Sequence, residues 1–69
     1  MGDTPLLNTL KAARADAGLT QADLADKVGV TRKTINTVEN GVFVPSTVLS
    51  LKLARALATT VEALFQLPE

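Results

Sequence analysis

Residues 20–40, TQADLADKVGVTRKTINTVEN, decide how this chain folds. Gly29 divides them into two short segments with apolar residues at helical spacing, and a threonine precedes each segment, at Thr20 and Thr31. Threonine is a good N-cap because its hydroxyl accepts a hydrogen bond from a free N–H group of the first helical turn. Asp23 supplies the second half of an approximate capping box. The stretch therefore predicts two short helices joined by a tight glycine turn.

The small and apolar residues of this stretch are placed as two closely crossing helices require. Helices that cross at roughly 90–120° approach closely only where a contact residue is small, which suits Ala25. The turn between them needs a residue with positive φ, which suits Gly29. Ile35 and Val38 then bury the inner face of the second helix. This arrangement leaves a polar outer face formed by Arg32, Lys33, Asn36 and Thr37.

The chain before this stretch predicts one helix. Thr4 fits an N-cap and Pro5 fits the first helical position. Gly18 fits the left-handed residue that ends a helix. The helix between them has one apolar stripe, formed by Leu6, Leu10, Ala13 and Ala17.

The chain after this stretch predicts an apolar connecting loop at residues 42–45 and then two more helices. Ser46 fits the N-cap of the first of them, and Thr60 fits the N-cap of a short last helix over residues 61–65. No segment alternates regularly between apolar and polar residues, as an exposed strand would. We therefore expect an all-α fold, with five helices in one compact domain over residues 1–69.

The composition argues against several classes of function. The chain has no cysteine and no histidine, which removes thiolate metal ligands and the commonest general base. No nucleophile–base pair is visible, and we expect no enzymatic activity, cofactor, metal ion or small-molecule ligand. The N-terminus lacks the features of a signal peptide and no apolar run is long enough to span a membrane. We therefore expect a cytoplasmic protein of prokaryotic or phage type, without membrane contact.

The charge distribution bears on nucleic-acid binding. Seven cations balance seven anions, so the basic excess that usually accompanies nucleic-acid binding is absent. Residues 27–38, however, contain three cations and no acidic residue. Local charge matters more than the total, because physiological salt screens exposed charges beyond about 8 Å.

On these residues the chain resembles the lambda repressor/Cro-like (XRE) family of helix-turn-helix DNA-binding proteins. The segment ARADAGLTQADLADKVGVTRKTINTVENG matches the core pattern of the family, and PSTVLSLKLARALATTVEALF matches its last two helices. The family consists of five-helix domains that bind operator DNA, commonly as homodimers, and regulate transcription. The resemblance implies a sequence-specific regulator, mainly a repressor, that binds an inverted-repeat operator in double-stranded DNA as a homodimer, with residues 20–40 as its helix-turn-helix.

The resemblance also implies roles for individual residues. The base-reading positions of the family are occupied by Arg32, Lys33 and Thr37, with Asn36 and Thr31 as helpers. The positions that contact phosphates are occupied by Thr20, Gln21, Thr34 and Asn40, together with the loop amides that follow Asn40. Arg14 and Glu39 match a partly buried ion pair that ties the first helix to the end of the recognition helix.

Three departures from the family pattern bear on partners. Val42 stands where a cation is frequent, Val48 stands where a charge is usual, and Ala58 replaces a frequent glycine, so we expect the fourth helix to end in another way. Exposed apolar residues often mark a protein interface. A homodimer interface is therefore predicted from Val42, Val44, Val48, Leu51, Phe65 and Leu67, the alternative being that these residues pack within the monomer.

A rival function follows from the same features. The zero net charge and Val42 favour a protein-interaction module, such as an antitoxin or an adaptor with the same fold. Arg32 and Lys33 favour DNA.

Overall fold

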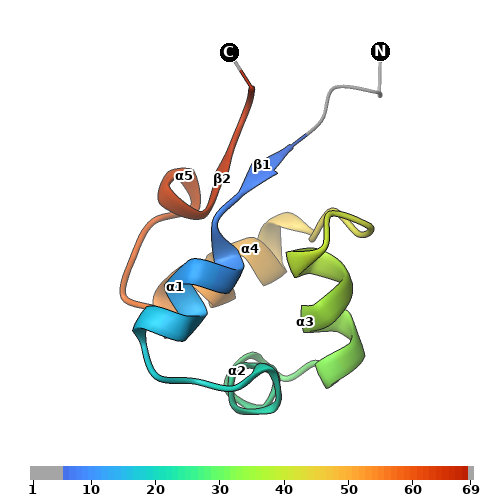
Figure 1. Cartoon of the computed structure of the whole chain (residues 1–69), viewed down its shortest axis with the longest axis vertical. Helices are drawn as coiled ribbons and strands as arrows, with labels where there is room; N and C mark the ends of the chain where they lie inside the picture. Colours follow the sequence, from blue (N-terminus) through green and yellow to red (C-terminus); the bar gives the residue numbers. More distant parts are fainter. Residues whose placement is uncertain (1–5, 69) are drawn as a thin grey trace.

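The described part of the chain folds into five helices and one two-stranded sheet (Figure 1). A computed structural model describes residues 6–68. The prediction of five helices is confirmed, whereas the short sheet was not predicted. In chain order the elements are β1 (Leu7–Asn8), α1 (Leu10–Asp16), α2 (Gln21–Val28), α3 (Arg32–Glu39), α4 (Thr47–Ala56), α5 (Val61–Leu64) and β2 (Phe65–Gln66).

The helix-turn-helix is formed by α2 and α3, and the local signals of the sequence account for its geometry. The Thr20 hydroxyl accepts from the Asp23 N–H and the Asp23 carboxylate accepts from the Thr20 N–H, each at 3.0 Å, which completes the predicted capping box. Gly29 has a φ of 76°, which provides the left-handed turn. The Thr31 hydroxyl accepts from the Thr34 N–H at 3.2 Å and begins α3.

The hydrophobic core lies between the helices and receives side chains from all five of them. The core also includes one residue of β2. The buried apolar residues are Leu10, Leu24, Ala25, Val28, Ile35, Val38, Leu49, Leu53, Ala54, Leu64 and Phe65.

Among the described residues, no helix combines the length and the apolar character needed to cross a membrane.

The predicted start of the first helix is wrong in the part that the structure describes, from residue 6 onward. Thr4 and Pro5 lie outside the described residues, and Leu6 precedes an extended segment instead of joining a helical stripe. Here β1 lies beside β2 (Figure 1) and pairs with it in antiparallel fashion. Leu7 is opposite Gln66. Thr9 then occupies the N-cap position of α1, and its N–H donates to the Leu64 carbonyl at 2.8 Å. Pairing with the C-terminal segment therefore replaces the first predicted helical turn.

The end of α4 also differs from expectation. Ala58 adopts the left-handed conformation that a glycine would take, with a φ of 54°. The Thr59 N–H donates to the Ala54 carbonyl at 2.9 Å and the Ala58 N–H donates to the Arg55 carbonyl at 3.2 Å, the pattern of a Schellman motif. The expectation that this helix ends in another way is therefore wrong, since the usual ending is kept with an alanine.

Candidate nucleic-acid interface

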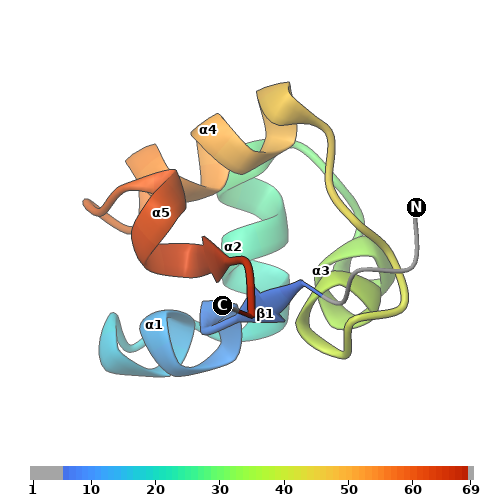
Figure 2. The same cartoon turned by 90° about the horizontal axis from the view of Figure 1, so that it is seen from above.

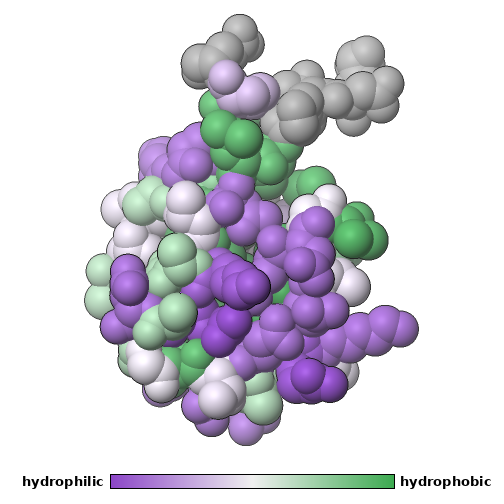
Figure 3. Space-filling view, viewed as in Figure 1, coloured by the Kyte–Doolittle hydropathy of each residue, from purple (hydrophilic) through white to green (hydrophobic). Residues whose placement is uncertain are grey.

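Two cations at the start of α3 have no role in holding the fold together. Arg32 and Lys33 are exposed, and neither side chain forms a hydrogen bond or a salt bridge with any part of residues 6–68. Cations at a helix N-terminus also oppose the helix dipole, so stability gives no reason for their position. Figure 3 shows that hydrophilic side chains gather over α3. Both cations are thus available to an anionic partner.

An amide network fixes the orientation of Asn36, which lies one turn further along α3. The Gln21 Nε2 donates to the Asn36 Oδ1 at 3.2 Å, and the Asn40 Nδ2 donates to the same oxygen at 3.2 Å. The Asn36 oxygen is therefore engaged within the protein. Its Nδ2 finds no acceptor among the described residues and remains free to donate outward.

A buried ion pair anchors this network to α1. The Arg14 Nε lies 2.5 Å from the Glu39 Oε2, and the Arg14 Nη2 lies 3.2 Å from the Glu39 Oε1. Only 13% of the Arg14 side chain and 1% of the Glu39 side chain are exposed. A third hydrogen bond to Glu39 comes from the Gln21 Nε2 at 3.0 Å, and the Arg14 Nη1 donates to the Leu19 carbonyl at 2.9 Å. The pair therefore joins α1, α2 and α3.

The charge state of Glu39 follows from these contacts. Burial acts to raise the pKa of Glu39, but the hydrogen bonds from Arg14 and Gln21 and the charge of Arg14 outweigh it, so the pKa lies below its ordinary value. The hydrogen bond to Glu39 in turn raises the pKa of Arg14. Both groups are charged at neutral pH, and each neutralises the other.

The N-terminus of α2 offers fewer donors than the sequence analysis expected. Both hydrogens of the Gln21 side-chain amide are used within the protein, which leaves its backbone N–H as the available donor. The Thr20 hydroxyl oxygen accepts from the Asp23 N–H. The hydrogen bonds from the Thr20 N–H and hydroxyl lower the pKa of Asp23, so a negative charge stands beside this N-terminus at neutral pH.

The loop amides after α3 are not available to phosphates, and this part of the expectation is wrong for residues 40–43. The Asn40 N–H donates to the Asn36 carbonyl and the Gly41 N–H donates to the Val38 carbonyl, both at 3.1 Å. The next two N–H groups both donate to the Thr37 carbonyl, at 3.0 Å and 3.2 Å. If Asn40 contacts a phosphate, it does so through its side chain.

The three threonines of α3 and its cap are partly engaged within the helix. The Thr31 and Thr34 hydroxyl oxygens lie 3.1 Å apart and share a hydrogen bond. The Thr37 hydroxyl donates to the Thr34 carbonyl at 2.9 Å. Toward a ligand, Thr37 therefore presents acceptor lone pairs and a methyl group.

The apolar residues predicted to form an interface do not form one surface. Phe65 is buried in the core, so its assignment to an exposed interface is wrong. Leu51 is 57% exposed and lines a groove of about 700 Å³ between α4 and α5. In both views α5 lies on the side of the molecule away from α3 (Figures 1 and 2). The other predicted residues are exposed outside this groove, at Val42, Val44, Val48 and Leu67.

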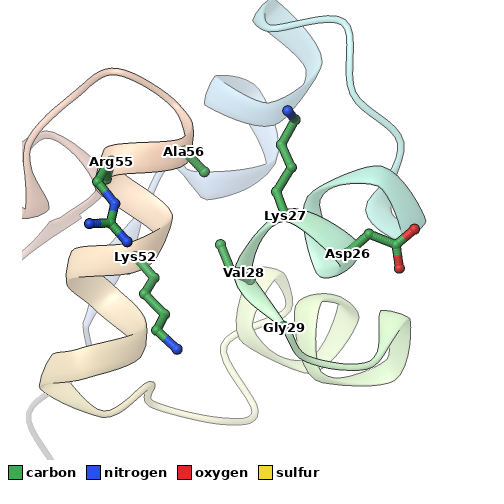
Figure 4. Close-up of a pocket in the computed structure, with 7 residues that line it drawn as sticks. All are labelled: Asp26, Lys27, Val28, Gly29, Lys52, Arg55 and Ala56. Atoms are coloured by element: carbon green, nitrogen blue, oxygen red, sulfur yellow. The ribbon is translucent and has the colours of Figure 1, made fainter.

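A basic hollow on another side of the molecule does not form part of this site. It encloses about 520 Å³ between the end of α2 and α4, and it is lined by the three cations Lys27, Lys52 and Arg55. Figure 4 shows that the charged ends of these side chains point in different directions. None of the residues predicted to contact DNA lines it. The hollow is not arranged to hold one anion.

Asn8 is a positioning residue that the sequence analysis missed. Its Nδ2 donates to the Val38 carbonyl at 2.9 Å, and its Oδ1 accepts from the Leu10 N–H at 3.2 Å. One side chain thus caps the start of α1 and holds the last turn of α3. An asparagine two residues before the start of a helix is a recognisable capping signal. It was missed because the sequence predicted that the first helix starts at Pro5 and not at Leu10.

Comparison with known proteins identifies the family. The helix-turn-helix family model matches residues 10–64. The uncharacterized HTH-type transcriptional regulator YgzD of Bacillus subtilis (strain 168) is 42% identical over 62 residues, which cover 90% of this chain and 94% of YgzD. An uncharacterized HTH-type transcriptional regulator of Methanothermobacter thermautotrophicus is 44% identical over 61 residues, which cover 87% of this chain and 88% of that protein.

Solved structures agree with this assignment. The clp gene regulator ClgR of Corynebacterium glutamicum matches with a TM-score of 0.74 and 30% identity, over 78% of this chain and 57% of ClgR. SinR, in a SinR–SinI complex, matches with a TM-score of 0.73 and 25% identity, over 78% of this chain and 53% of that chain. The chain thus spans little more than half the length of these two proteins. It belongs to the lambda repressor/Cro-like (XRE) family of helix-turn-helix proteins and is a DNA-binding transcriptional regulator, not an enzyme.

Proposed function

We propose that this regulator is a repressor that inserts α3 into the major groove of an inverted-repeat operator. The observation that carries the proposal is the outer face of α3, where Arg32 and Lys33 are exposed and unpaired among the described residues and Asn36 is held with its donor outward. An α-helix fits the major groove, where side chains can distinguish all four base pairs. These three residues therefore supply the donors for base recognition.

The remaining contacts divide between bases and phosphates. Thr37 and Thr31 complete the base-reading set. The Thr20 hydroxyl and the Gln21 backbone N–H face phosphate at the α2 N-terminus, where free N–H groups favour an anion. Asp23 opposes this binding, so the site depends on Arg32 and Lys33 for its affinity. Two further phosphate contacts come from the side chains of Thr34 and Asn40.

The homodimer is proposed to form through the α4–α5 groove. The groove presents apolar surface around Leu51, and a partner bound there leaves α3 free because α5 lies on the opposite side. Val44, Val48 and Leu67 add exposed apolar surface outside it. Sedimentation equilibrium is expected to show a dimer at micromolar concentration, and Leu51→Asp is expected to give a monomer. A wild-type protein that remains monomeric at that concentration contradicts this interface.

In vitro selection from a random double-stranded DNA pool tests the proposed function directly. A palindromic consensus is expected, with Arg32→Ala binding the selected site more weakly by roughly 1–3 kcal/mol and losing preference at one base position. Loss of affinity that is uniform over all sequences would make Arg32 a phosphate contact. Failure to enrich any sequence contradicts operator binding.

One observation favours a second candidate, a protein-binding adaptor or antitoxin. SinR, a structural neighbour, is seen in a complex with the SinI protein, and this chain exposes apolar side chains on the loop after α3 and on α4. Under this candidate the selection yields no consensus, and Arg32→Ala leaves the partner bound.

A further inference from the structure

The loop after α3 places apolar surface directly beside the proposed base-reading face. A hollow of about 340 Å³ lies between them and is open to solvent. Figure 3 shows hydrophobic surface at the edge of the molecule where this loop follows α3 in Figure 1. Two loop residues line the hollow on one side and α3 with its cap lines the other, the full set being Thr31, Lys33, Thr34, Thr37, Val42 and Phe43.

Val42 is held at this position by the backbone. Gly41 has a φ of 74°, which turns the chain back onto the helix. The Val42 N–H then donates to the Thr37 carbonyl at 3.0 Å, and the Phe43 N–H donates to the same oxygen at 3.2 Å. The Val42 side chain remains 78% exposed, the largest exposed fraction among the large apolar residues of the described chain. The loop is therefore ordered while its valine is left open to solvent.

The chemistry of the loop side of this hollow does not suit phosphate. The valine side chain has no donor, and the N–H groups of the two loop residues are already bonded to Thr37. Lys33 and Thr37 are four residues apart on α3 and share one face. Val42 lines the same hollow as these two residues. Thr37 adds a methyl group at this edge because its hydroxyl is bonded back to the helix. A base edge at this point meets apolar surface.

We propose that Val42, with the methyl group of Thr37, binds the C5-methyl group of a thymine in the operator. The methyl group of thymine is the apolar feature among the base edges of the major groove, and apolar side chains recognise it there. The inference rests on the proposed function, because it requires α3 to lie in the major groove. It adds a preference for T·A at the base pair next to the one that Lys33 and Thr37 contact.

Replacing single thymines by deoxyuridine tests this contact, since deoxyuridine pairs like thymidine and lacks only the methyl group. The probe is the selected duplex, with each thymine substituted in turn, and fluorescence anisotropy gives the Kd. One thymine in each half-site is expected to show a loss of roughly fourfold for the wild-type protein, as burial of one methyl group implies. Val42→Thr keeps the size of the side chain but replaces one of its two methyl groups by a hydroxyl, and it is expected to bring the ratio of the two Kd values measurably below fourfold.

Val48→Thr is the matched control, because Val48 is a similarly exposed valine that does not line this hollow. It should keep the thymine-over-deoxyuridine ratio, whatever its effect on overall affinity. A wild-type protein that binds its consensus but ignores the methyl group at every thymine overturns the inference and leaves the proposed function standing. A methyl effect that persists unchanged in Val42→Thr overturns the role of Val42. Failure to select any consensus overturns both proposals.

Discussion

Ala58 stores backbone strain at the end of α4. Its φ of 54° lies in the left-handed region, where the β-carbon of an L-residue costs roughly 1–2 kcal/mol. Ala58→Gly is therefore expected to raise the free energy of unfolding by roughly 1 kcal/mol after the greater entropy of unfolded glycine is allowed for. Urea denaturation of the free protein measures the change.

Gly29→Ala is the converse variant. A β-carbon at Gly29 meets no atom within 4 Å, so its effect comes from the backbone φ of 76° alone. It should lower the free energy of unfolding by roughly 1 kcal/mol. If Ala58→Gly were no more stable than the wild type, the backbone strain assigned to Ala58 would be contradicted.

Glu39 makes stability depend on pH. Its pKa is lower in the folded protein than in the unfolded chain, so its contribution is complete above the unfolded value, about 4.3, and is lost as the pH falls through the folded value. Glu39→Gln is expected to cost roughly 3 kcal/mol at neutral pH, because it leaves Arg14 largely buried without its partner charge.

The difference between wild type and Glu39→Gln should shrink as the pH falls below about 4, and denaturation at several pH values measures it. Asp26→Asn removes an exposed carboxylate and serves as the control, with an expected change within about 0.5 kcal/mol at every pH. A difference that stays constant with pH would show that Glu39 acts through its shape and not its charge.

At the scale of elements, the features that could be predicted from the sequence are those that depend on residues close together in the chain. The caps at Thr20, Thr31, Ser46 and Thr60 depend on residues three positions apart, and all four accept the expected N–H. The β1–β2 pair joins residues almost sixty positions apart, and each strand has only two residues, too few to show a period. The true start of α1 was missed for the same reason, because pairing with the C-terminal segment overrides the local helix signal.

The distinction between local contacts and contacts from distant parts of the chain applies to the candidate site as well. The cations on the outer face of α3 could be placed from helical spacing alone. The orientation of Asn36 and the use of the Gln21 amide could not, because both depend on side chains brought together from two helices. The loop amides were assigned wrongly because their acceptors, the Thr37 and Val38 carbonyls, are backbone groups of α3, and residue type does not reveal backbone acceptors.

Asn8 links three elements, and its replacement tests that link. Asn8→Ala removes the cap of α1 and leaves the Val38 carbonyl without its donor, with an expected loss of roughly 1–3 kcal/mol in the free energy of unfolding. Asn8→Asp keeps the acceptor for the Leu10 N–H but loses the donor, and it places a negative charge at the C-terminal end of α3, which the helix dipole disfavours. Both variants should therefore be destabilised, and an aspartate variant as stable as the wild type would contradict the contact with Val38.

At the scale of the whole molecule, one copy of the chain presents a single α3 and can therefore read one half-site. Successive major grooves on one face of the duplex lie 34–36 Å apart, about the longest dimension of the molecule, 34 Å. To read both half-sites, two copies joined through the α4–α5 groove have to hold their α3 helices one turn apart, with half-site centres about 10 base pairs apart. Inserting about 5 base pairs between the half-sites turns one of them to the opposite face of the duplex. Affinity is then expected to fall to that of a single half-site in an electrophoretic mobility assay, whereas monomeric Leu51→Asp should bind both spacings equally. Equal wild-type affinity for the two spacings would mean that the copies bind independently, and the homodimer would have to be abandoned while base reading by α3 remained.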